Sequence, residues 1–89
     1  MHKIANIDVD VKYRRPGNVV AYFSIIFEVY KNGNKFYAIP LANEENKRLT
    51  NLPAELSFRI QNGTIYDVAH GSEEVVESLV ERLKGLEWI

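Results

Sequence analysis

Three Gly-containing turns divide most of the chain into runs typical of β-strands, and they constrain the fold more than any other feature. The turns are RPG at 15–17, KNG at 31–33 and QNG at 61–63. Each lies between runs rich in β-branched and aromatic residues, which is the sequence pattern of a β-hairpin. We therefore expect antiparallel strands joined by short loops.

The length of each loop decides which face of each strand is buried, because side chains alternate along a strand. In the first hairpin a three-residue loop, at 15–17 or 16–18, puts the apolar residues of both strands on one face. Three-residue KNG and QNG loops would extend that face along the later strands. All three turns then predict one buried face: Ala5, Ile7, Val9, Val11, Tyr13, Ala21, Phe23, Ile25, Phe27, Val29, Tyr37, Ile39, Leu41, Leu56, Phe58, Ile60, Tyr66 and Val68.

The C-terminal segment changes to a helical period. Ser72 is a candidate N-cap, Gly85 is the expected C′ residue, and one apolar stripe runs between them through Val76, Leu79, Val80 and Leu83. The chain of 89 residues indicates a single domain over 1–89. The predicted class is α+β: an antiparallel sheet of about five strands, built from three hairpins with a long loop after the third strand, and one C-terminal helix packed on one face.

Composition excludes several classes of protein. There is no cysteine, so disulfides do not contribute to stability. The first ten residues include Asp8 and Asp10, where a signal peptide needs an apolar run, and no apolar stretch reaches the roughly 18 residues of a membrane span. We expect a soluble, cytoplasmic protein with no membrane partner. The formal net charge of −1 also argues against a strongly basic nucleic-acid-binding domain.

The run Val19–Tyr30 is apolar on both of its faces, which raises the question of what covers the second face. The face opposite the helix predicts a protein interface with aromatic anchors and a charged rim. Its partner would be a second copy of the chain or a larger target protein. Alternatively, the long loop or the C-terminal tail covers this face, or its tyrosines are ordinary exposed residues of a strand. The predicted interface residues are Tyr22, Ile26, Tyr30, Phe36 and Ala38.

Residues that could support catalysis or metal binding do not form a recognisable site. Asp8 and Asp10 would share one face of a strand, but a third ligand is missing from the pattern, and charges there also protect an edge strand. His70 and Asp67 are three residues apart and would point to opposite faces of a strand. No stretch matches a family motif. We expect no enzyme activity, no cofactor and no metal.

The alternative function is nucleic-acid binding through the basic hairpin tip Lys12–Gly17. A two-stranded ribbon fits the major groove, and basic side chains at its tip could contact phosphates. The candidate residues are Lys12, Tyr13, Arg14 and Arg15 at the tip, with Lys47 and Arg48 as a second contact.

Overall fold

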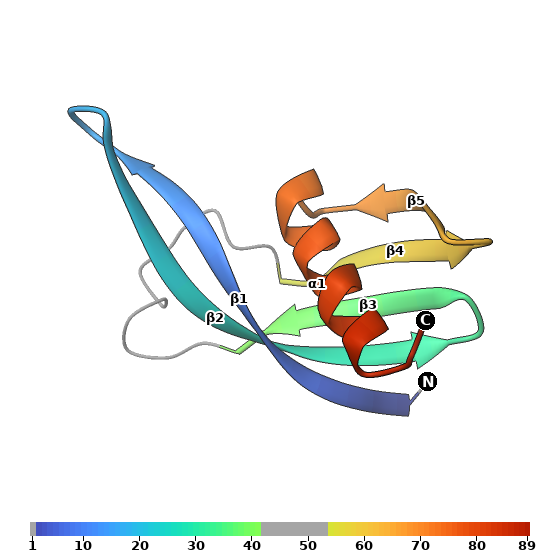
Figure 1. Ribbon diagram of the computed structural model, residues 1–89. Helices are drawn as coiled ribbons and strands as arrows, with labels where there is room; N and C mark the ends of the chain where they lie inside the picture. Colours follow the sequence, from blue (N-terminus) through green and yellow to red (C-terminus); the bar gives the residue numbers. More distant parts are fainter. Residues whose placement is uncertain (1, 42–53) are drawn as a thin grey trace.

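The computed structural model describes residues 2–41 and 54–89, and for residues 13–15 it describes the backbone alone. Within these residues it contains a five-stranded antiparallel sheet and one helix, which confirms the predicted α+β class (Figure 1). The sheet order is β1-β2-β3-β4-β5, so strands adjacent in the chain are also adjacent in the sheet. The elements are β1 (His2–Arg15), β2 (Val19–Asn32), β3 (Lys35–Pro40), β4 (Leu56–Gln61), β5 (Thr64–Ala69) and α1 (Glu73–Gly85).

The first hairpin has the predicted parity, because residues 16–18 form a three-residue loop. Gly17 (φ +85°) and Asn18 (φ +62°) adopt left-handed conformations, which glycine and asparagine tolerate best. β1 and β2 have 14 residues each, whereas β3 has 6. The outer part of this hairpin, residues 10–15 and 19–24, therefore projects from the sheet as a two-stranded ribbon (Figure 1). We call this part the ribbon.

The second turn is shorter than the sequence pattern predicts. Asn32 pairs with Lys35, so the loop consists of Gly33 and Asn34 alone. Gly33 has φ +62°, as expected at the first central position of a two-residue type II′ turn. The predicted three-residue KNG loop is therefore wrong.

This difference of one residue exchanges the two faces of β3. Phe36 and Ala38 point into the core and are 2% and 0% exposed, whereas Tyr37 and Ile39 lie half-buried on the other face. The prediction that Tyr37, Ile39 and Leu41 face the core is wrong. Both alternating sets of β3 are apolar, so its sequence pattern does not distinguish the two faces.

The third turn also has two residues rather than three. Gln61 pairs with Thr64, and the loop residues Asn62 and Gly63 have φ +52° and +77°. Two successive left-handed residues define a type I′ turn, for which Asn-Gly is the preferred sequence. With this loop, Ile65 packs against the core and the predicted QNG loop is wrong.

A β-bulge in β5 then resets the register. Two residues of β5 lie opposite Phe58, and one of them, Asp67, has φ +57°. Phe58 thereby avoids the direct pairing with Asp67 that a regular ladder would impose. Tyr66, predicted to face the core, is 37% exposed and hydrogen-bonds polar residues on the opposite face, whereas Val68 lines a hollow beside α1.

The helix begins as predicted and ends later. Ser72 is the N-cap and its Oγ accepts a hydrogen bond from Val75 N at 3.3 Å. Gly85 lies inside the helix, and the left-handed C′ residue is Glu87 at φ +64°. The bonds Glu87 N to Lys84 O and Trp88 N to Leu83 O, both 3.0 Å, form a Schellman motif that satisfies the last carbonyls.

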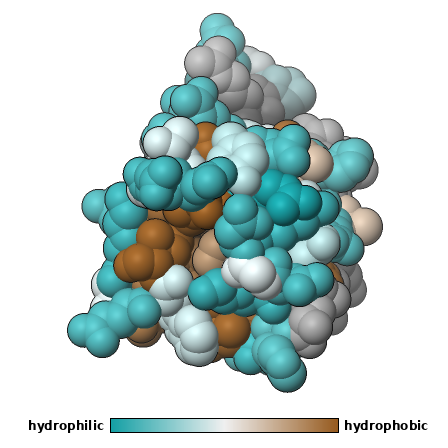
Figure 2. All heavy atoms as spheres, turned by 90° about the vertical axis from the view of Figure 1, so that its right-hand side faces the viewer, coloured by the Kyte–Doolittle hydropathy of each residue, from teal (hydrophilic) through white to brown (hydrophobic). Residues whose placement is uncertain are grey.

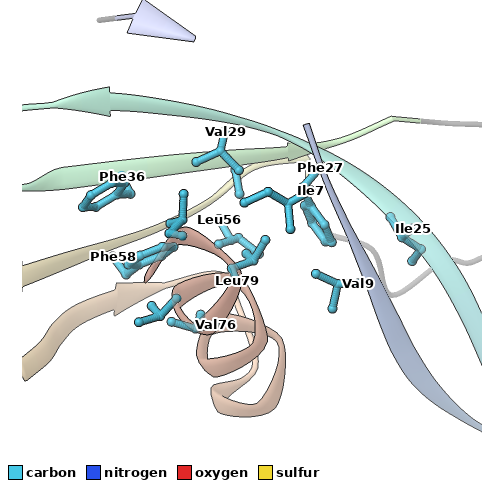
Figure 3. Packing of buried hydrophobic residues seen from close by; sticks show 13 residues of the cluster. Ile7, Val9, Ile25, Phe27, Val29, Phe36, Leu56, Phe58, Val76 and Leu79 are labelled. Carbon is cyan, nitrogen blue, oxygen red and sulfur yellow. The ribbon is translucent and has the colours of Figure 1, made fainter. Parts of the chain in front are cut away.

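The core lies between α1 and one face of the sheet (Figure 3). The predicted stripe of α1 is buried, and the rings of Phe36 and Phe58 stack at 5.4 Å between centroids with an interplanar angle of 11°. Burial of these apolar side chains is the main stabilising contribution to the fold. The core residues are Ile7, Val9, Ile25, Phe27, Val29, Phe36, Ala38, Leu56, Phe58, Val76, Leu79, Val80 and Leu83.

Candidate functional site

The candidate site is the outer face of the sheet, which is the face opposite α1. Along β2, side chains at even positions point to this face, since Ile25, Phe27 and Val29 fill the core. Tyr22 and Ile26 lie there as predicted, 66% and 38% exposed, and Tyr30 lies there half-buried. Tyr22 has the highest exposed fraction of the exposed large apolar residues in the described part of the chain.

Two of the five predicted interface residues do not belong to this face. Phe36 and Ala38 are core residues, because the two-residue loop before β3 reverses its faces. Tyr37 and Ile39 take their places, with Tyr37 paired directly to Tyr30 across the β2–β3 ladder. The Asn-Gly-Asn sequence at 32–34 could have indicated this, because Asn-Gly and Gly-Asn both favour two-residue hairpin loops. We call Tyr22, Ile26, Tyr30, Tyr37 and Ile39 the outer strip.

Two carboxylates beside the outer strip, Asp8 and Glu28, are already bonded within the chain. Lys3 Nζ lies 2.8 Å from Glu28 Oε2, and the Tyr30 hydroxyl donates to the same oxygen at 3.4 Å. The hydrogen bond from Lys3 lowers the pKa of Glu28, and the same bond raises the pKa of Lys3. Ser24 Oγ donates to Asp8 Oδ1 at 2.7 Å. Each of these carboxylates thus has a partner before any second molecule arrives.

The part of the outer face over β4 and β5 is polar. Arg59 Nη1 donates to Asn34 Oδ1 at 3.1 Å, and Asn34 Nδ2 donates to the Tyr66 hydroxyl at 3.0 Å. Arg59 Nε also lies 3.2 Å from Asp67 Oδ2. This network separates the outer strip from the β5 edge and limits the apolar area to β2 and β3.

The residues of the basic tip are only partly described. Lys12 is exposed on the outer face and pairs with Tyr22 across the β1–β2 ladder. Tyr13, Arg14 and Arg15 belong to β1, but their side chains lie outside the described part. Lys47 and Arg48 lie outside the described residues altogether. Of the nucleic-acid candidates, the structure therefore places only the side chain of Lys12.

The end of the molecule that carries the tips of the β2–β3 and β4–β5 hairpins has a separate apolar patch (Figure 2). At this end the C-terminal tail lies beside the β2–β3 turn, where Trp88 and Ile89 line a hollow of about 210 Å³ together with Phe36 and Ile60. Trp88 is 41% exposed. The tail thus covers the edge of the core rather than the outer strip.

A third hollow brings together residue types that occur in hydrolases. Glu55, Ser57 and His70 line a space of about 460 Å³. An activated nucleophile needs a hydrogen bond to its base, and none joins these three side chains. His70 is exposed and has φ +61°. These three side chains therefore line one hollow but lack the hydrogen bond between nucleophile and base that nucleophilic catalysis uses.

The described residues contain neither a cluster of metal-ligating side chains nor a helix that could span a membrane. Among residues 2–41 and 54–89, no three acidic, histidine or cysteine side chains gather as a cation would require. No helix in the same ranges has the length and apolar character needed to cross a membrane.

No protein-family model, curated protein or solved structure matches this chain, so comparisons with known proteins add no functional assignment.

Proposed function

We propose that this chain is a non-catalytic protein-interaction module that associates with a second copy of itself through the outer side of the sheet, with Tyr22 as its anchor. The observation that carries the proposal is the exposure of Tyr22, whose aromatic side chain is 66% exposed near the middle of the ribbon. Aromatic residues supply a large contact area at a low cost in conformational entropy, and they are enriched at interfaces.

The electrostatics of the same surface favour association. Asp8 and Glu28 beside the outer strip are each bonded within the chain, so an approaching protein would not leave them newly unpaired. The formal net charge of −1 gives little long-range repulsion between copies. A two-fold axis lets one patch serve both molecules, which is the simplest way to cover such a surface. A larger target protein could use the same residues.

The proposal is tested by the molar mass of the wild type and of two aspartate variants, measured by light scattering after size-exclusion chromatography. We expect Tyr22→Asp to weaken association without unfolding the chain, because this side chain is mostly exposed. Val68→Asp is the matched control, since Val68 is 45% exposed and lines a hollow on the α1 side of the sheet. Equal masses for the wild type and both variants would contradict the proposal.

Nucleic-acid binding is the second candidate, and the projection of the ribbon favours it (Figure 1). Lys12 is exposed, and the tip sequence adds Arg14 and Arg15. Phosphate contacts make affinity fall steeply as salt rises, whereas contact through apolar surface is less sensitive to salt. Anisotropy of a labelled duplex at low and at physiological salt separates the two functions. Binding that disappears in Lys12→Gln but persists in Tyr22→Asp would favour the nucleic-acid candidate.

A further inference from the structure

Among the described strands, one side of β2 has no neighbour along the ribbon. β3 pairs with β2 from Asn32 to Phe27, and a final bond from Leu41 N to Ile26 O, 2.8 Å long, ends this ladder. From Ser24 to Val19, β2 pairs with β1 alone among the described strands. Such an edge presents backbone donors and acceptors that another strand can use.

The direction of the backbone groups follows from the bond at Ile26. Ladder bonds in an antiparallel pair alternate between the two sides of a strand, so residues at even positions share the side of Ile26. Val20, Tyr22 and Ser24 therefore direct their N–H and C=O groups away from β1. None of these backbone groups has a hydrogen-bond partner in the described part of the chain.

The two outermost strands of the sheet carry protective features that this edge lacks. On β1, a register shift interrupts the strand between Lys3 and Ala5, and Arg82 Nη1 of α1 bonds the Asp8 carbonyl at 3.1 Å. On β5, the bulge at Asp67 interrupts the ladder. Bulges, charges and cover by other elements are the usual protection against edge pairing. In β2, the run Val19–Phe27 contains no charge and no proline.

We infer that the β2 edge at Val20, Tyr22 and Ser24 pairs antiparallel with the same edge of a second copy, joining the two sheets into one. The inference rests on the proposed self-association and specifies its geometry. One register pairs all three residues among themselves: Tyr22 lies opposite Tyr22 of the second copy, and Val20 lies opposite Ser24 in both directions. Tyr22 would then form an aromatic cross-strand pair at the two-fold axis.

The chemistry of the ribbon favours a second copy as the occupant of this edge. Side chains on both faces of the new ladder are uncharged: Val20, Tyr22 and Ser24 on the outer face, and Ala21 and Phe23 on the inner face. β1 pairs Asp10 with Ser24 and Arg14 with Val20. The antiparallel register therefore sets Asp10 of each copy level with Arg14 of the other at three strand spacings, about 14 Å, so these charges contribute a weak, salt-screened attraction. A parallel arrangement would align like charges at the same distance. The interface is small, and such interfaces belong to the weak, transient class.

The test uses two substitutions at one position. Ser24→Pro removes an N–H that points away from β1, and proline is tolerated where a strand's N–H faces solvent. Ser24→Ala is the control, because both variants lose the hydroxyl bond to Asp8 and only the proline blocks the edge. By sedimentation equilibrium, we expect Ser24→Pro to lower the association constant at least about tenfold. Ser24→Ala should retain association, because its backbone N–H stays available to the second copy.

Amide hydrogen exchange in the wild type gives a second test that does not depend on the folding of a variant. Exchange at Val20, Tyr22 and Ser24 should slow as concentration rises, while exchange at Ala21, which bonds β1, should not change with concentration. Dimerisation that survives Ser24→Pro and is lost in Ile26→Asp would overturn edge pairing but retain association through the outer strip. Edge pairing would also be overturned if the dilute monomer already protected the amides of Val20, Tyr22 and Ser24 from exchange. A wild type that stays monomeric would refute both proposals.

Discussion

Truncation of Phe36 tests the register of β3, which decides the composition of both faces of the sheet. Phe36 is 2% exposed and stacks on Phe58, whereas its neighbour Tyr37 is half-buried on the outer face. Removing a buried phenylalanine typically costs about 3–5 kcal/mol, and an aromatic pair adds about 0.5–1.5 kcal/mol beyond area burial. We therefore expect Phe36→Ala to destabilise the fold far more than Tyr37→Ala.

The loss of unfolding free energy expected for Phe36→Ala lies at the lower end of the range of about 3–5 kcal/mol. Phe36 borders a hollow of about 210 Å³ beside Trp88, so neighbouring side chains can move partly into the space left by the ring. A loss of about 3 kcal/mol corresponds to a fall of about 12–24 °C in the melting temperature of a domain of this size. For Tyr37→Ala we expect about 1 kcal/mol, or about 4–8 °C.

Thermal and urea unfolding followed by far-ultraviolet circular dichroism measure both variants. This signal is preferable to the fluorescence of Trp88, which lies beside Phe36 and would respond to the substitution directly. If Tyr37→Ala proved as costly as Phe36→Ala, the two-residue loop before β3 would be wrong. The three-residue KNG loop would then describe the chain better.

Two further predictions concern the rim and the bulge. The hydrogen bond with Lys3 lowers the pKa of Glu28. This bond therefore stabilises the fold at pH values above the ordinary glutamate pKa, and its stabilisation is lost as pH falls through the lowered pKa. We expect Glu28→Gln to lower the urea midpoint at about pH 7 and to approach the wild type as pH falls below the lowered pKa of Glu28; a pH-independent difference would contradict this. Asp67→Val puts a β-branched residue at φ +57° and should cost about 1–2 kcal/mol, whereas Asp67→Asn, which tolerates this conformation, should cost less in thermal unfolding. Equal losses would indicate that the backbone at Asp67 is unimportant.

The parts of the fold that follow from the sequence are those with one clear hydrophobic period. β1 alternates apolar and charged residues, so its buried face is unambiguous. The helix has an N-cap serine and a single apolar stripe, and the structure confirms both. Only the end of the helix differs, because Gly85 stays helical and Glu87 adopts the left-handed conformation. A glycine near the end of a helix is thus an incomplete signal for where the helix stops.

The errors arise where the local pattern permits two solutions. β3 reads Lys-Phe-Tyr-Ala-Ile-Pro, with apolar residues on both alternating sets, so the loop length alone determines that Phe36 is buried. In β5 the preference of Asn-Gly for a two-residue turn conflicts with the alternation of the strand. The bulge at Asp67 resolves this conflict, and a bulge has no simple period in sequence. The edge of β2 that has no neighbour among the described strands depends on the different lengths of β2 and β3, so it requires the structure.

The most direct test of the central claim is the molar mass of the wild type by sedimentation equilibrium, from about 10 μM to about 1 mM, the range in which weak interfaces form. Self-association through the side of β2 that carries Tyr22 predicts a mass that rises from one chain towards two as concentration increases. A mass of one chain throughout this range would contradict the account.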